Sequence, residues 1–253
     1  MTSPVILLTG ASRGIGLSVA HFLLSTTPTA RLILAARSTT SLSALHEQYP
    51  DRTSFITADF SLSGEGKKVV QYALDTYGRL DALCVVHGVL DPVKRLEDAV
   101  GEEWGRAVQI GLVAVVEMVQ AAIPELRKTK GRAVFVSSGA AVTPYLAWGA
   151  YGAMKAALNH LAMTLAAEEP EIRSISVRPG VIDTQMQDEI REKHGEAMRE
   201  VHERFLELKA QGKLLRPEQP GNVIARLALS MDKELSGKFL SWNSPELAAY
   251  QDK

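Results

Sequence analysis

Val5-Ile-Leu-Leu-Thr-Gly-Ala-Ser-Arg-Gly-Ile-Gly-Leu17 joins a short apolar run to a glycine-rich loop. This order predicts a buried strand, a tight turn at Gly10 and a helix that begins close to Gly14. Gly14 and Gly16 leave room for the main chain to approach a pyrophosphate group at the amino end of that helix. The G-x-x-x-G-x-G spacing differs from the commoner G-x-G-x-x-G fingerprint, but its place between a strand and a helix favours a dinucleotide site.

Short apolar runs and longer amphipathic stretches alternate along the rest of the chain. Most of the runs are continuously apolar, which is typical of strands buried on both faces of a parallel sheet. The sequence therefore predicts an α/β fold: a Rossmann-type, doubly wound parallel sheet of about seven strands with helices on both faces. The predicted strands are 5–9, 31–36, 54–57, 82–86, 133–136, 174–177 and 238–241, and the predicted helices include 14–25, 63–77, 102–128, 149–168 and 217–231.

No boundary between domains is visible, so we expect a single domain over residues 1–253. Within it, residues 183–216 are highly charged, helical in pattern and longer than a strand-to-helix connection needs. Met186, Met198 and Phe205 are spaced among the charges. The segment is either a lid over the substrate site or a solvated pair of surface helices.

The composition is that of an ordinary globular protein. Lys and Arg (28) nearly balance Asp and Glu (29), which gives no reason to expect nucleic acid or an anionic membrane as a partner. Neither a targeting segment nor a run of about 18 apolar residues, as a membrane span requires, is predicted. The one cysteine, Cys84, lies in an apolar run, which favours a core position and a reducing compartment. We expect a cytoplasmic protein, and no metal site, because no cluster of His, Cys, Asp or Glu has ligand spacing.

The residues after the second predicted strand bear on the choice of nucleotide. NAD-dependent enzymes commonly place Asp or Glu there to bind the ribose 2′-hydroxyl. This chain has Arg37, a residue that pairs with a 2′-phosphate, and Arg13 in the glycine loop adds a second cation. These charges favour NADP(H) over NAD(H).

Three further residues predict proton chemistry beside that nucleotide. Tyr151 and Lys155 are four residues apart in a predicted helix, so they share one face of it. A neighbouring ammonium favours the phenolate and brings the pKa of a tyrosine toward the working range. Ser138 follows the strand 133–136, where a hydroxyl faces the ligand crevice of a parallel sheet.

Taken together, these motifs resemble the short-chain dehydrogenase/reductase family along the whole chain. The glycine loop 9–16 looks like the family's cofactor loop, and the Ser138, Tyr151 and Lys155 set matches its catalytic trio. The stretch 178–184 looks like its nicotinamide-side segment. Residues 136–151, 158–160 and 180–186 are most similar to a fungal branch that resembles benzil and sepiapterin reductases.

The resemblance implies an enzyme that passes hydride between NADP(H) and a small, largely apolar ketone or diketone, in either direction. Ser138 would bind the carbonyl oxygen, Tyr151 would exchange the proton, and Lys155 would lower the phenol pKa and hold the nicotinamide ribose. Residues expected at the cofactor are Gly10, Ser12, Arg13, Gly14, Ile15, Gly16, Arg37, Asp59, Phe60, Gly88, Tyr151, Lys155, Pro179, Val181 and Thr184. Those expected around the substrate are Val89, Leu90, Tyr145, Trp148 and Met186.

Two positions depart from the family pattern. The family's Asn-Ala-Gly after the fourth strand reads Val86-His87-Gly88, and the asparagine that bends the helix after Trp104 is Gly111. Glycine permits the bend, but it has no side chain to hold the water that relays protons to the lysine in the family. Three outcomes therefore stay open: a weaker proton relay, a different water path, or loss of turnover. His87 is either a substitute or a structural residue. The alternative function is a non-catalytic or weakly active NADP(H)-binding protein that acts by interaction. A methyltransferase with the same loop geometry fits less well, because Arg37 and the catalytic trio argue against it.

Family members commonly form dimers or tetramers through helices that correspond to 102–128 and 149–168. We therefore expect a homodimer or homotetramer. An apolar face of the second helix either joins such an interface or packs on the sheet, and it comprises Leu158, Leu161, Ala162 and Leu165.

Overall fold

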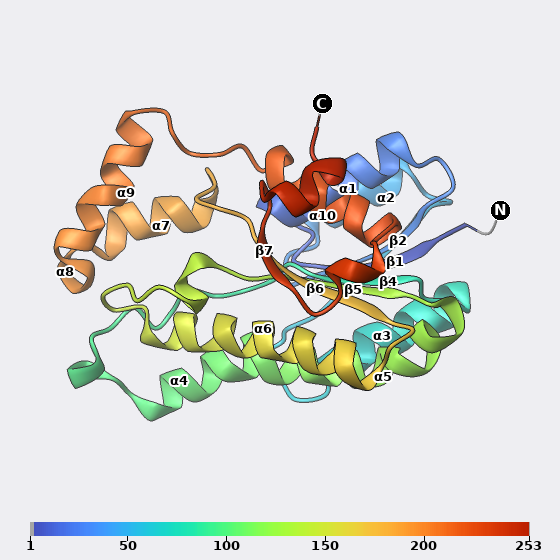
Figure 1. Cartoon of the computed structure of the whole chain (residues 1–253), viewed down its shortest axis with the longest axis horizontal. Helices are drawn as coiled ribbons and strands as arrows, with labels where there is room; N and C mark the ends of the chain where they lie inside the picture. Colours follow the sequence, from blue (N-terminus) through green and yellow to red (C-terminus); the bar gives the residue numbers. More distant parts are fainter. Residues whose placement is uncertain (1–2, 253) are drawn as a thin grey trace.

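The computed structural model describes residues 3–252 and contains a seven-stranded sheet in which all neighbouring strands are parallel. The strand order is β3-β2-β1-β4-β5-β6-β7, so the chain moves outward on both sides of β1 (Figure 1). After β3 the chain returns to the other side of β1, and this change of direction creates a crevice at the carboxyl ends of β1 and β4. The strands are β1 Val5–Thr9, β2 Arg31–Ala36, β3 Thr53–Thr57, β4 Ala82–Val85, β5 Arg132–Val136, β6 Arg173–Arg178 and β7 Phe239–Ser241.

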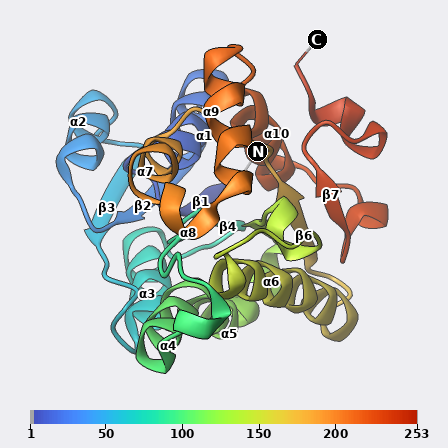
Figure 2. The same cartoon turned by 90° about the vertical axis from the view of Figure 1, so that its left-hand side faces the viewer.

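Helices cover both faces of the sheet, and each face has its own apolar core (Figures 1 and 2). On one side lie α1 (Gly14–Thr26), α2 (Thr40–Gln48) and α10 (Glu218–Leu229). On the other lie α3 (Glu65–Tyr77), α5 (Ala114–Thr129) and α6 (Gly149–Glu168). The doubly wound α/β prediction is confirmed. Helix α2 is absent from the predicted segments because its mean hydropathy is low and only Leu42 and Leu45 are buried.

The apolar face of α6 packs on the sheet, which is one of the two alternatives left open by the sequence. Leu158, Ala162 and Leu165 are at most 3% exposed and pack in the core on the sheet, with Leu161 beside them. The three buried residues are therefore unavailable to a second subunit. Cys84, in β4, is also in the core, and burial raises the pKa of its thiol to about 12.

The helix predicted at 102–128 is a longer rod with an irregular turn inside it. It runs through α4 (Gly101–Val108), a π-helical turn (Gln109–Val113) and α5. By length and composition this stretch, Gly101–Thr129, is apolar enough to cross a membrane, so the prediction that no such run exists is wrong. In the structure α5 packs against α3 and β4, as a core helix does.

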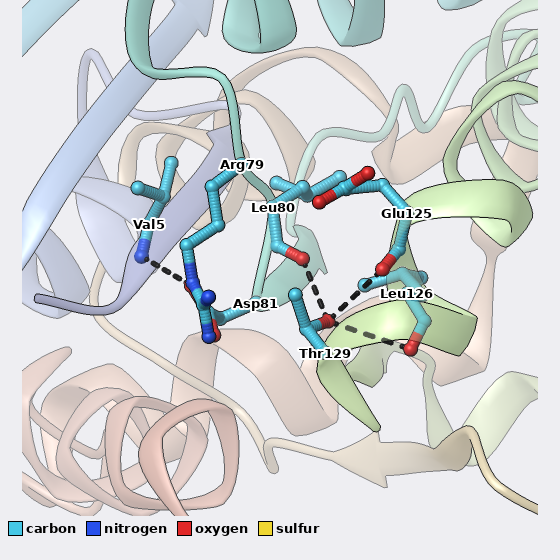
Figure 3. Close-up of polar contacts among 7 residues, drawn as sticks. All are labelled: Val5, Arg79, Leu80, Asp81, Glu125, Leu126 and Thr129. Atoms are coloured by element: carbon cyan, nitrogen blue, oxygen red, sulfur yellow. Dashed lines mark hydrogen bonds and ion pairs between the residues drawn. The ribbon is translucent and has the colours of Figure 1, made fainter. Parts of the chain in front are cut away.

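Polar contacts hold the amino ends of the central strands together (Figure 3). Asp81, which is 7% exposed, accepts the main-chain N–H of Val5 through Oδ2 at 2.9 Å. The Arg79 guanidinium donates to both carboxylate oxygens of Asp81, at 2.8 and 2.7 Å. Nearby, the Thr129 hydroxyl at the end of α5 donates to the Leu80 carbonyl at 2.9 Å. These contacts join β1, β4 and α5 at the sheet edge opposite the crevice.

We expect Asp81→Ala to lower the free energy of unfolding by about 1–3 kcal/mol, because the buried Val5 N–H loses its acceptor. Urea denaturation measures this change. The control is Asp75→Ala on α3, an exposed aspartate whose side chain accepts from Gln71; we expect it to change stability by less than about 0.5 kcal/mol. Equal effects of the two substitutions would contradict the assigned role of Asp81.

Candidate active site

A cavity of about 830 Å³ opens along the carboxyl edge of the sheet. The segments that follow each of the strands β1 to β6 form its walls, together with α6. All predicted cofactor and catalytic residues line this one cavity. Of the predicted substrate residues, Val89, Tyr145, Trp148 and Met186 line it too.

The glycine loop has the close packing that a nucleotide cradle needs. Gly10 and Gly14 have positive φ values of 67° and 54°. A Cβ on Gly16 would lie 2.1 Å from the Gly10 carbonyl oxygen, so no side chain fits there. The Ncap residue of α1 is Arg13, and its side chain makes no capping hydrogen bond. The first N–H groups of this helix are thus available to a phosphate, and the residues present fit a dinucleotide.

Two arginines lie where the adenosine end of a dinucleotide is expected. Arg37 follows β2, lines the cavity, and contributes with the Ser61 hydrogen bonds to lowering the pKa of Asp59. Asp59 Oδ1 accepts from both the N–H and the hydroxyl of Ser61, at 3.0 and 2.8 Å. Arg13 donates from Nη1 to Gln185 Oε1. The glycine loop is therefore in contact with the helix that follows β6, which the sequence did not predict.

The predicted trio meets in the cavity. Tyr151 and Lys155 project from α6, and Lys155 Nζ lies 5.8 Å from the centre of the Tyr151 ring. The Ser138 side chain lies close enough to the Tyr151 phenol to lower its pKa, and its own Oγ accepts from the Ala140 N–H at 3.1 Å. Lys155 Nζ donates to the Val136 carbonyl at 2.7 Å. The hydroxyl of Ser138 and the ammonium of Lys155 are thus fixed by main-chain hydrogen bonds, and the ring of Tyr151 packs edge-on against Trp148.

Burial controls the protonation of this trio. It raises the pKa of Tyr151 above its ordinary value, and the nearby Ser138 side chain offsets this only in part. It also lowers the pKa of Lys155 to about 8. The net direction for the Tyr151 pKa is opposite to the sequence-based expectation, because desolvation of the phenolate outweighs the lowering effect of Ser138. At neutral pH the structure favours a neutral phenol beside an ammonium.

Aromatic rings line the part of the cavity beyond Tyr151. Trp148 stacks on Tyr145 with centroids 5.0 Å apart, and meets Tyr151 edge-on at 5.5 Å. Phe205 closes the row 5.4 Å from Trp148. Phe205 was missed as a site residue; its only signal was an apolar residue within a charged helix. Leu90 lines an adjoining cavity of about 650 Å³, which shares Val89 and Met186 with this one.

Phe205 belongs to a helical excursion after β6, seen as the orange helices in Figure 2. Residues of this excursion, among them Met186, Ile190 and Phe205, line one side of the cavity. The excursion comprises α7 (Gln185–Lys193), α8 (Gly195–Met198) and α9 (Glu200–Ala210). Its two ends pair with each other, since the Asp183 N–H donates to the Leu215 carbonyl and the Leu215 N–H to the Val181 carbonyl. The excursion therefore leaves and rejoins the fold at one place.

The two departures from the family pattern lie side by side. Gly111 is buried in the π turn, and a Cβ there would come within 2.7 Å of Met154 Sδ. His87, on the cavity wall, makes two hydrogen bonds: Nδ1 with the Thr9 hydroxyl at 2.7 Å and Nε2 with the Ile110 carbonyl at 3.0 Å. Desolvation is the main cause that lowers the pKa of His87 to about 4, and nearby Lys155 contributes.

Because His87 has a lowered pKa, we expect the folded protein to lose stability in acid. The unfolded chain binds a proton near pH 6.5, whereas folded His87 stays neutral down to about pH 4. The free energy of unfolding should therefore fall by up to about 3 kcal/mol as pH drops through that range. Urea denaturation across this range should show a smaller fall for His87→Gln than for the wild type. His21→Gln, at an exposed position on α1, is the control that should keep the full fall. Parallel curves for all three proteins would contradict the prediction.

Comparison with known proteins agrees with this geometry. The short chain dehydrogenase family model matches residues 4–195. An uncharacterised oxidoreductase of Schizosaccharomyces pombe is 44% identical, with 95% of this chain and 96% of that protein covered. A benzil reductase of Saccharomyces cerevisiae that forms (S)-benzoin is 36% identical, with 98% of each covered. The crystal structure of a Saccharomyces cerevisiae short chain dehydrogenase/reductase has a TM-score of 0.95 at 40% identity, with 98% of this chain and 100% of that chain covered. The chain therefore belongs to the short-chain dehydrogenase/reductase family of nicotinamide-dependent oxidoreductases.

Proposed function

We propose that the protein is an NADP(H)-dependent carbonyl reductase that converts a small apolar or aromatic ketone or diketone to an alcohol, or runs the reverse reaction. The observation that carries this proposal is the convergence of Ser138, Tyr151 and Lys155 on one cavity beside a row of aromatic rings. The name of the Saccharomyces cerevisiae benzil reductase supports an aromatic diketone as the substrate class.

In this mechanism NADPH supplies the hydride. Ser138 donates a hydrogen bond to the carbonyl oxygen and fixes its position. Tyr151 keeps its proton at neutral pH because burial raises its pKa, and it releases that proton to the same oxygen as negative charge develops there. The Lys155 ammonium, 5.8 Å from the ring, stabilises the phenolate that remains.

The cofactor proposal is based on the glycine loop and the two arginines. The first N–H groups of α1 would hold the pyrophosphate, and Arg37 and Arg13 would pair with a 2′-phosphate. The other contacts proposed for the cofactor come from Ser12, Ile15, Asp59, Phe60, Gly88, Pro179, Val181 and Thr184.

We propose that residues 183–216 act as the substrate lid. Phe205 brings α9 onto the aromatic row, and Met186 lies on the wall of the same cavity. With Val89, Tyr145 and Trp148 these residues form an apolar pocket for the organic part of the substrate.

We also propose that the chain is one domain over residues 1–253 and works in the cytoplasm as a homodimer or homotetramer. Val113, Val116 and Met163 are exposed apolar residues on the π turn, α5 and α6, and Met163 is 54% exposed. They supply the apolar surface that a subunit interface needs. Neither nucleic acid nor a membrane is an expected partner.

The test is NADPH oxidation by the purified full-length protein with a panel of benzil, other aryl diketones and short aliphatic ketones. We expect turnover of the aryl diketones, with the alcohol identified by chiral chromatography. Fluorescence titration measures NADPH binding in parallel. Tight NADPH binding without turnover across the panel would overturn the proposal in favour of a non-catalytic NADP(H)-binding protein.

A further inference from the structure

The π turn between α4 and α5 releases one main-chain carbonyl. In an α-helix the Ile110 carbonyl would accept from the N–H of Ala114, four residues on. Here the Ala114 N–H donates instead to the carbonyl of Gln109, five residues back. A π turn of this kind leaves a carbonyl that needs another donor, and such turns are frequent at functional sites.

The side chain of His87 satisfies this carbonyl. Nε2 lies 3.0 Å from the Ile110 oxygen, which can only accept, so Nε2 carries the proton. Nδ1 is then the acceptor, and the Thr9 hydroxyl donates to it at 2.7 Å. His87 therefore links the end of β1 to the π turn as a neutral side chain with a defined tautomer.

This link lies next to the catalytic turn of α6. Gly111, one residue beyond the capped carbonyl, packs against Met154 Sδ, and Met154 lies between Tyr151 and Lys155 in the sequence. On the other side of His87, a Cβ on Gly88 would lie 3.4 Å from Lys155 Nζ. A shift of the π turn or of the loop 86–88 would therefore change the positions of the Tyr151 phenol and the Lys155 ammonium.

We propose that His87 is a positioning residue for the reduction: by donating to the Ile110 carbonyl it holds the π turn against Met154 and so fixes Tyr151 and Lys155 in the cavity. In this chain His87, Gly111 and Met154 together take the place of an asparagine in the helix. The inference depends on the proposed function, because it assigns His87 a role through the proposed trio.

Three variants separate the two hydrogen bonds of His87. In His87→Gln the amide nitrogen reaches the place of Nε2 and keeps a donor for Ile110. In His87→Asn the amide oxygen takes the place of Nδ1 and keeps only the acceptor for Thr9. His87→Phe keeps a ring next to Phe60, whose centroid lies 4.2 Å from that of the imidazole, and removes both hydrogen bonds.

We expect His87→Phe and His87→Asn to lower kcat by about 10- to 100-fold per folded protein, as a small misplacement of catalytic groups does. His87→Gln should keep most of the activity. The pH profile of kcat should shift in the same two variants. A kcat and pH profile that stay at wild-type values in folded His87→Phe, or better rescue by Asn than by Gln, would overturn the inference.

A second readout does not need turnover. The phenol pKa of Tyr151, followed by NMR of ¹³C-labelled tyrosine and assigned with Tyr151→Phe, should move in His87→Phe and stay in place in His87→Gln. Wild-type protein that binds NADPH but reduces nothing would overturn the proposed function alone. An unmoved Tyr151 pKa in His87→Phe would overturn the positioning role alone.

Discussion

Tyr151→Phe should lower the rate of diketone reduction by about 10²- to 10⁴-fold, the range that a positioned general acid contributes. The substitution removes only the hydroxyl near Ser138 and leaves the ring against Trp148. NADPH binding should therefore persist, so the loss appears in kcat rather than in cofactor affinity. Steady-state kinetics and a fluorescence titration with NADPH measure the two quantities separately.

The matched control is Tyr77→Phe. Tyr77 ends α3, outside the cavity, and its ring lies under the Arg31 guanidinium, a contact that phenylalanine keeps. We expect its kcat to equal that of the wild type. If Tyr151→Phe also kept full kcat, another group would have to be the proton donor and the proposed mechanism would fail.

Arg37→Asp should reverse the preference for the nucleotide. Arg37 lines the cavity beyond β2, where a carboxylate would bind a ribose 2′-hydroxyl and repel a 2′-phosphate. Loss of charge-assisted hydrogen bonds, each worth about 1.5–3 kcal/mol, together with the new repulsion should change the NADPH-to-NADH ratio of kcat/KM by about 10²- to 10³-fold.

Arg31→Asp serves as the control, since Arg31 begins the same strand at the opposite edge of the sheet and is exposed. Its nucleotide ratio should match that of the wild type. A preference for NADH already present in the wild type, or a ratio unmoved by Arg37→Asp, would show that Arg37 does not bind the 2′-phosphate.

The fold was predictable because a parallel sheet buried on both faces requires continuous apolar strands. Residues 5–9 and 31–36 are such runs, and both strands lie at the predicted positions. Helix α2 was harder, because a short polar helix with two buried leucines has little hydrophobic periodicity. The π turn was also absent from the prediction, since it depends on a hydrogen-bond partner, His87, that is distant in sequence.

The site residues that could be predicted from the sequence are those that lie close together along the chain. Gly10, Gly14 and Gly16 lie within one loop, and Tyr151 and Lys155 within one turn, so spacing alone places them together. Phe205, in contrast, reaches Trp148 only because the excursion after β6 folds back. The direction of the Tyr151 pKa shift depends on how much water the whole cavity excludes, which spacing does not reveal.

Cys84 gives the protein a practical property. Its thiol is the one cysteine of the chain and lies inside the sheet, where thiol-reactive labels neither reach it nor find a thiolate. A cysteine introduced at Leu206, an exposed position on α9, would consequently be the sole site for a fluorophore or spin label. The native sequence thus adds no second labelling site, so a probe at position 206 would report directly whether α7–α9 move when NADPH or substrate binds.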